Sequence, residues 1–107
     1  GSDIGAGYER SMVRVARAMI ETASQRENPI PSASSAWHDI TAGAAAALQW
    51  SDVGRLQSGC RADVLVIEPD IKWLDSPADP LSMLMFAWDD RWIKRTYLRG
   101  IKRYTSL

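Results

Sequence analysis

The residue types that most often carry chemistry are scarce in this 107-residue chain, which holds one histidine, His38, and one cysteine, Cys60. A structural zinc site needs about four such ligands, so these two residues cannot build one. His38 stands between Trp37 and Asp39, and we expect it on the surface or at a helix end rather than as a ligand. Cys60 precedes a cation, Arg61, but the sequence arranges no base to activate it, so a catalytic thiol is not expected.

The start of the chain holds a stronger candidate for a functional residue than His38 or Cys60, a carboxylate among very small residues. Asp3 lies in the segment Gly1-Ser2-Asp3-Ile4-Gly5-Ala6-Gly7, directly before a predicted helix. Small residues allow the backbone to bend closely around whatever this carboxylate holds. The segment also fits a helix N-terminal cap or a phosphate-binding turn, although its spacing matches neither the dinucleotide motif nor the P-loop. From the residues alone these interpretations stay open.

The segment Arg91–Tyr104 mixes cations with aromatic residues, which are the ingredients of a surface that stacks single-stranded nucleic acid. Alternating strands would instead place the basic side chains on a solvated face, where they protect a sheet edge from aggregation. We favour the interpretation as a solvated face, because nearby acidic residues neutralise much of the basic charge. The chain has 13 Lys+Arg and 13 Asp+Glu, so its net charge of zero gives no global reason to bind nucleic acid or an anionic membrane.

Composition places the chain among ordinary soluble domains, with 46% apolar residues. Its apolar stretches fall far short of the roughly 18 residues that indicate a membrane span. A single cysteine cannot form an internal disulfide, so we expect a reducing, cytoplasmic setting. The chain opens without Met or a signal pattern, which suggests a piece of a longer protein; whether Gly1-Ser2 is native or a cloning remnant stays open.

Two helices are predicted in the first half. Apolar residues recur at spacings of three and four from Tyr8 to about Gln25, as in an amphipathic helix, and the prolines at 29 and 31 end it. A second helix is expected through about Gln49, capped by Ser34 or Ser35. Its alanine-rich centre allows close packing, so we expect this helix to be buried.

The second half reads mainly as strands. The run Ala62–Ile67 is continuously apolar after Asp63, which suits a strand buried on both faces. A short helix is predicted over Leu81–Trp88, with Asp79 as its cap and Pro80 in the first turn. Two further strands, Trp92–Leu98 and Ile101–Tyr104, should form a hairpin at Arg99-Gly100. Helices that precede strands indicate an α+β fold. The thin sheet and the five Trp leave much apolar surface exposed, which suggests that this unit does not stand alone.

Several motifs resemble the amidohydrolase superfamily, and within it most closely the guanine deaminase branch. The opening segment through Tyr8, followed by Ser11-Met12, resembles the stretch after the eighth barrel strand. Thr41–Leu48 is similar to the helix that leaves the barrel, and Val53–Ile67 carries the pattern Gly-x-Leu-x-x-Gly-x-x-Ala-Asp of the outer β-sandwich. Asp89–Gly100 looks like the closing strand of this branch. The stretch Gln57–Cys60 and the residue Ile101 depart from the usual pattern.

The resemblance implies that residues 1–50 are the end of a metal-dependent hydrolase (β/α)8 barrel and that residues 51–107 are the C-terminal part of a small composite β-sandwich. It implies a parent enzyme that depends on zinc, or alternatively on another divalent metal, and that deaminates guanine to xanthine and ammonia. Asp3 would lie at the end of strand eight as a metal ligand and as the catalytic carboxylate that passes protons. No cofactor-binding residue beyond the metal ligand is implied.

The family's histidine ligands and its proton-shuttling glutamate have no counterpart in the chain, so we expect it to be metal-free and inactive by itself. Another amidohydrolase, acting on a triazine, a pyrimidine or a modified nucleoside, and a non-catalytic interaction domain remain alternatives. The expected partners are a purine-like small molecule, bound by the parent enzyme, and a second copy of the chain. The apolar stripe of the first helix would be covered either by the sheet of the same chain or by this second copy. Neither nucleic acid nor a membrane is expected as a partner.

Overall fold

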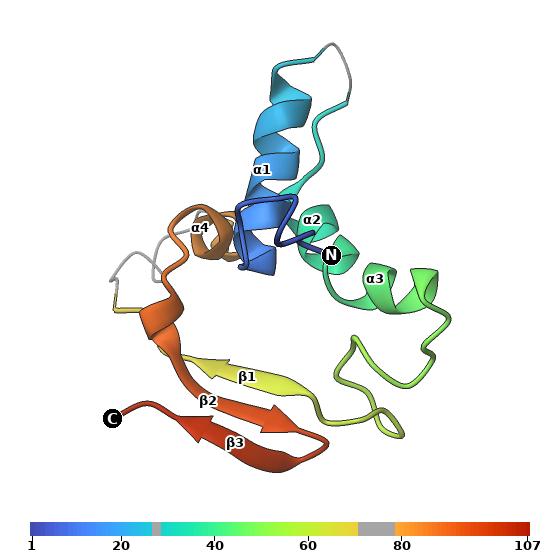
Figure 1. Ribbon diagram of the computed structural model, residues 1–107, viewed down its shortest axis with the longest axis vertical. Helices are drawn as coiled ribbons and strands as arrows, with labels where there is room; N and C mark the ends of the chain where they lie inside the picture. The colour runs from blue at the N-terminus through green and yellow to red at the C-terminus, as the bar shows by residue number, and fades with distance from the viewer. Residues whose placement is uncertain (27–28, 71–78) are drawn as a thin grey trace. The chain divides into compact units, whose positions relative to one another are not determined.

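The computed structural model describes residues 1–26, 29–70 and 79–107 of a chain that contains both helices and strands (Figure 1). The chain divides into two compact units. Gly1–Ile40 with Ser76–Trp88 forms the helical unit, and Thr41–Asp75 with Asp89–Leu107 forms the sheet unit. The mixture of helix and strand confirms the expected α+β character. No helix in the described ranges is long and apolar enough to cross a membrane.

Three helices pack on one another in the helical unit: α1 (Met12–Ser24), α2 (Ala33–Asp39) and α4 (Pro80–Phe86). The predicted apolar stripe of α1 is confirmed, because Val13, Ala16 and Ile20 are buried. The helix begins at Met12 rather than at Tyr8. Its N-cap is Ser11, whose hydroxyl accepts a hydrogen bond from the Arg14 amide and so satisfies one of the free donors of the first turn.

The predicted helix from Ser34 or Ser35 to Gln49 is wrong, because the structure has two short helices there. The first is α2, capped by Ser32 rather than by Ser34 or Ser35, and the second is α3 (Ala42–Ala47) in the sheet unit. The break falls at Ile40-Thr41, two adjacent β-branched residues that lose side-chain freedom in a helix. The expectation of a buried helix is also too strong, since Ala45 is the buried residue of α3.

The short helix α4 confirms the prediction made from Asp79 and Pro80. The Asp79 carboxylate accepts hydrogen bonds from the Leu81 amide at 3.1 Å and from the Ser82 hydroxyl at 2.8 Å. Pro80 occupies the first turn, where its missing amide hydrogen costs nothing. Met85 on this helix is fully buried and belongs to the core of the helical unit.

The sheet unit contains an antiparallel three-stranded sheet in the order β1 (Val64–Ile67), β2 (Ile93–Leu98), β3 (Ile101–Thr105). A 3-10 turn, η2 (Asp90–Trp92), leads into β2. The predicted hairpin is confirmed, since β2 and β3 pair directly around Arg99 and Gly100, which both have positive φ. Positive φ at both positions gives the turn the backbone twist that hairpins favour.

The expectation that the strand at 62–67 is buried on both faces is wrong for this chain. The strand β1 covers Val64–Ile67, none of its residues is buried, and the Leu65 side chain is 50% exposed. Within the described sheet β1 pairs only with β2, so it is an edge strand rather than a central one. An apolar run predicts burial, but the two faces of a strand are buried only when other elements pack on both faces of its sheet.

Candidate functional site

The segment around Asp3 is a closed backbone turn in the helical unit. The Asp3 carbonyl oxygen accepts hydrogen bonds from the amides of Ala6, at 3.1 Å, and of Gly7, at 2.6 Å. The Gly5 amide donates to the Gly7 carbonyl at 3.2 Å, and Ile4 forms an isolated bridge with Gly7. Five residues therefore return the chain upon itself directly before α1, as the small residues of the segment predict.

Asp3 has φ of 52°, which places its backbone in the left-handed region. This region costs most residues roughly 1–2 kcal/mol, and aspartate and asparagine tolerate it better than others. Gly5, with φ of 110°, takes a conformation that side chains rarely adopt. The turn thus fixes the direction in which the Asp3 side chain leaves the backbone.

The Asp3 residue is exposed, and within the described parts of the chain no hydrogen bond or ion pair engages its carboxylate. Its oxygens are therefore accessible to a partner outside the chain. A carboxylate oxygen is a suitable ligand for zinc and for harder divalent cations. Across residues 1–26, 29–70 and 79–107, no group of three or more His, Cys, Asp and Glu side chains gathers. The chain offers Asp3 as a single ligand and supplies no complete metal site in this part.

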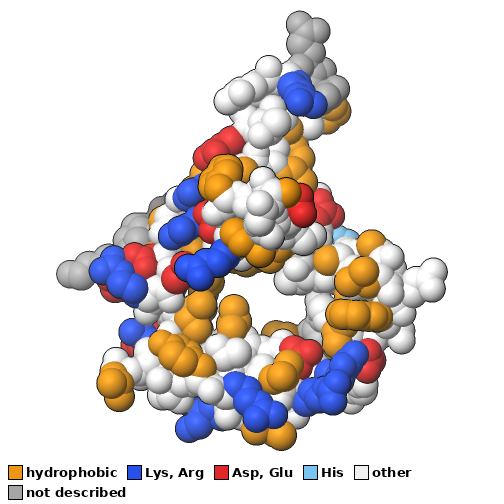
Figure 2. All heavy atoms as spheres, viewed as in Figure 1, with side chains coloured by type: hydrophobic (Ala, Val, Ile, Leu, Met, Phe, Trp, Pro, Cys, Tyr) orange, Lys and Arg blue, Asp and Glu red, His pale blue; other side chains and the backbone are white. Residues whose placement is uncertain are grey.

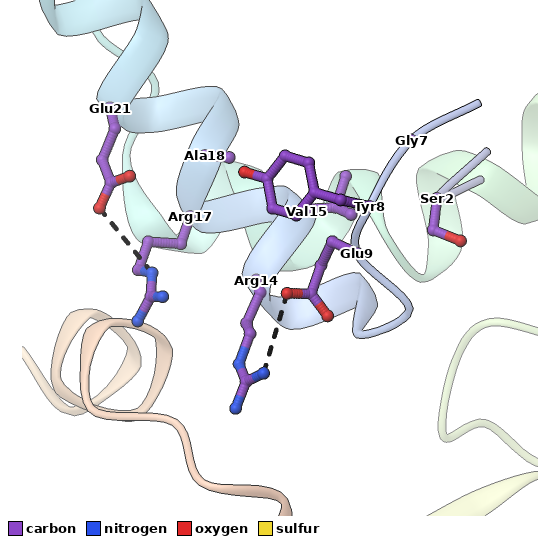
Figure 3. Close-up of a pocket in the computed structure, with 9 residues that line it drawn as sticks. All are labelled: Ser2, Gly7, Tyr8, Glu9, Arg14, Val15, Arg17, Ala18 and Glu21. Atoms are coloured by element: carbon purple, nitrogen blue, oxygen red, sulfur yellow. Dashed lines mark ion pairs between the residues drawn. The ribbon is translucent and has the colours of Figure 1, made fainter. Parts of the chain in front are cut away.

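Next to the turn lies a small pocket of about 240 Å³ on the surface of α1 (Figure 3). Charged side chains in it form two ion pairs, Arg14 with Glu9 and Arg17 with Glu21, each at 3.8 Å. The side chain of Tyr8 lies beside these pairs and is almost fully exposed. Because carboxylates already accompany both cations, the pocket has no strong charge of one sign with which to hold an ionic ligand.

Glu9 connects the turn to the start of α1. Its Oε1 accepts hydrogen bonds from the amides of Arg10, at 2.9 Å, and of Ser11, at 2.8 Å. The hydrogen bond from Ser11 is the main reason that the pKa of Glu9 lies below its ordinary value of 4.5. The roles of Glu9 and Ser11 were not predicted from the sequence. The spacing of Glu9 and Ser11 before the apolar stripe of α1 is the signal that could have found this cap.

The other candidate residues do not join Asp3 in one site. His38 lies on α2 with its side chain 65% exposed and its Nδ1 3.6 Å from the Asp39 carboxylate. Cys60 is a free, half-buried cysteine in the sheet unit. Within the described ranges, neither residue belongs to a cluster of three or more potential ligands. That neither residue acts as a metal ligand or as a catalytic thiol stays a prediction.

The basic and aromatic segment forms the hairpin of the sheet unit. All of β3 is exposed, including Lys102, Arg103 and Tyr104. Figure 2 shows Lys and Arg side chains interleaved with hydrophobic ones over the strands. Arg91 is held by Asp89, whose carboxylate accepts its Nε at 3.0 Å. The adjacent cations Lys102 and Arg103 on this exposed edge strand fit the edge-protecting interpretation.

Comparison with known proteins identifies a family and a similar solved structure. The profile of the amidohydrolase family matches residues 1–102. Among solved structures, the guanine deaminase of E. coli matches with a TM-score of 0.88 and 30% sequence identity. That match covers 100% of this chain and 27% of the E. coli enzyme, so the chain spans a minor part of that enzyme's length. A search of curated proteins finds no match.

Proposed function

Because the chain belongs to the amidohydrolase family, we propose that it is the C-terminal part of a metal-dependent aminohydrolase that converts guanine to xanthine and ammonia. The hydrolase class follows from the family. The choice of guanine is supported by one observation, the similarity along the whole chain to a guanine deaminase. Residues 1–50 would close a (β/α)8 barrel, and residues 51–107 would complete a small β-sandwich.

In this proposal Asp3 carries the contribution of the chain to catalysis. Amidohydrolases generally use a divalent metal, often zinc, which makes water nucleophilic at neutral pH. The exposed carboxylate of Asp3 fits such a metal as one oxygen ligand, and the other ligands must come from outside the described residues. Beside the reacting centre the same carboxylate can accept a proton and return it to the departing ammonia. The closed turn of residues 3–7 holds its backbone for this task.

The test is an assay of ammonia release from guanine by the complete reading frame that encodes this chain, with and without a chelator. Asp3→Asn is the informative variant, because asparagine also tolerates the left-handed backbone but cannot act as a base. We expect kcat/KM to fall about 10²–10⁴-fold, as for the loss of a general acid–base group. Asp39→Asn makes the same chemical change on an exposed residue of the helical unit and should leave the activity intact.

Each other outcome has a definite meaning. A protein that binds metal but does not act on guanine would favour a triazine, a pyrimidine or a modified nucleoside as the substrate. Assays with a panel of these amines would identify it. Full activity of the Asp3→Asn variant would remove the proposed role of Asp3. A protein with no bound metal and no activity on any of these amines would favour a non-catalytic interaction domain.

The remaining expectations about the whole protein stay predictions. They are a purine-like small molecule as substrate, a cytoplasmic location, and self-association with a second copy. Part of the α1 surface lined by Val15, Ala18 and Met19 is available for such an association within the described helical unit. Sedimentation at several concentrations checks it, since a monomer at every concentration would contradict the homo-oligomer.

A further inference from the structure

Gly7 closes the turn that carries Asp3, and the space around its Cα is nearly filled by backbone. A Cβ added to Gly7 would lie 2.9 Å from the Ser2 carbonyl oxygen and 3.3 Å from the Asp3 carbonyl oxygen. The first distance is shorter than carbon and oxygen atoms tolerate without a bond. Neither oxygen can rotate away as a flexible side chain would, so any residue other than glycine must displace the backbone of residues 2–3.

An added side chain at Gly7 would displace the backbone around Asp3 rather than the segment that leads into α1. Downstream of Gly7, the chain is attached to the helix by Glu9, which accepts the amides of Arg10 and Ser11, and by the Ser11 cap. Upstream, the hydrogen bonds that fix Asp3 from within the turn come from Ala6 and Gly7. A side chain at Gly7 therefore pushes directly on the peptide groups that orient Asp3.

We propose that Gly7 is a positioning residue for the Asp3 carboxylate, which it places through its 2.6 Å hydrogen bond to the Asp3 carbonyl and through the absence of a side chain. The proposal rests on the proposed function of Asp3. Catalytic groups are sensitive to such shifts, because a displacement of about 1 Å can lower the rate about 10²-fold. Gly7 itself touches neither substrate nor metal in this proposal.

The test compares Gly7→Ala with Gly59→Ala in the complete protein. Gly59 lies in the sheet unit and has nothing within 4 Å of an added Cβ, so its change strains only its own backbone, at φ of 89°, and displaces neither Ser2 nor Asp3. We expect Gly7→Ala to lower kcat by about 10²-fold while KM stays within about twofold. The Gly7→Ala variant should also release its metal at a lower chelator concentration than the wild type, whereas Gly59→Ala should match the wild type in kcat, KM and metal release.

A merely structural glycine would behave differently. It would lower the unfolding temperature and leave kcat and metal retention unchanged in the folded enzyme. That result would overturn the proposal, and so would loss of the folded state in Gly7→Ala while Gly59→Ala folds. The double variant Asp3→Asn/Gly7→Ala gives a second test: if Gly7 acts through the Asp3 carboxylate, the alanine causes no further loss of kcat in the Asp3→Asn protein.

Failure of this inference and failure of the proposed function give different results. A wild-type protein without metal and without ammonia release would overturn the proposed function itself. A wild-type protein that is active, an Asp3→Asn variant that is inactive, and a Gly7→Ala variant with wild-type kcat and metal retention would overturn only the role of Gly7.

Discussion

The indole rings of Trp37 and Trp88 meet edge to face, with centroids 6.1 Å apart and planes inclined at 68°. Trp37 also donates from Nε1 to the Leu81 carbonyl at 2.9 Å, and Trp88 is 8% exposed. Edge-to-face aromatic pairs add stability beyond the area they bury. Through these two contacts α2 is joined to α4 and to Trp88, which lies two residues beyond the last residue of α4.

Trp37→Phe should lower the free energy of unfolding by about 1 kcal/mol, because a smaller aromatic ring is kept but the hydrogen bond to Leu81 is lost. Trp88→Ala should cost about 3–5 kcal/mol, since it removes a large buried side chain. Trp50→Phe is the matched control, because Trp50 is 55% exposed and its change should stay within about 0.5 kcal/mol. Urea unfolding measures all three. Equal effects of Trp37→Phe and Trp50→Phe would contradict the role of the hydrogen bond.

Local patterns in the sequence were sufficient for the elements whose signals lie in consecutive residues. The apolar spacing predicted the body of α1, Asp79-Pro80 predicted the start of α4, and Arg99-Gly100 predicted the hairpin. The break at Ile40-Thr41 was missed, because the alanine-rich stretch around it has strong helix propensity. The structure brings Gly54 against the Thr41 carbonyl at this break, a contact that no local pattern reveals.

The candidate site shows the same division. Asp3 could be singled out from the sequence, because a lone carboxylate among glycines is visible in the residues themselves. The contact of Gly7 with the Ser2 and Asp3 carbonyls could not, since it depends on how the backbone closes over five residues. Across residues 1–26, 29–70 and 79–107, the structure gathers no group of three or more potential ligands around Asp3.

Gly54 is expected to be a second position where alanine is poorly tolerated, here for stability. Its φ is 85°, and an added Cβ would lie 2.8 Å from the Thr41 carbonyl oxygen and 3.0 Å from the Ala45 side chain. We expect Gly54→Ala to lower the free energy of unfolding by about 1–3 kcal/mol through overpacking, in addition to the backbone strain. Thermal unfolding followed by circular dichroism measures the loss.

Gly59 provides the control for this prediction. It has a similar φ of 89° but nothing within 4 Å of an added Cβ. Gly59→Ala should therefore show only the backbone cost of about 1 kcal/mol. If both alanine variants lose the same amount, the contact of Gly54 with Thr41 and Ala45 contributes nothing.

The ion pair between Asp52 and Arg61 predicts a pH dependence of stability in the sheet unit. Arg61 donates from a terminal nitrogen to the Asp52 carboxylate at 3.0 Å, and this hydrogen bond holds the pKa of Asp52 below its ordinary value of 3.8. Because the folded pKa is the lower one, the pair stabilises the fold above pH 3.8 and its contribution is lost as the pH falls through the folded pKa.

The prediction is tested by unfolding temperatures of the wild type and Asp52→Asn between pH 7 and about pH 2. The wild type should be the more stable protein at pH 7, and the difference should shrink below pH 3.8. Arg61→Gln should give the same profile, and the double variant should show no additional loss. If the difference in unfolding temperature between the wild type and Asp52→Asn is constant over this pH range, the ion pair does not cause the pH dependence of stability.

The hairpin turn offers a stabilising change. Arg99 has φ of 52° and Gly100 has φ of 76°, and the Arg99 amide donates to the Asp63 carboxylate at 2.7 Å. Asparagine tolerates a positive φ better than arginine, and Asn-Gly is a favoured pair in this turn. Arg99→Asn keeps the backbone hydrogen bond to Asp63 and should raise the free energy of unfolding by about 0.5–1 kcal/mol. Arg99→Val should lower it, because a β-branched residue disfavours positive φ. Urea unfolding of the two variants checks both signs, and a destabilised asparagine variant would mean that the Arg99 side chain contributes more than its backbone strain costs.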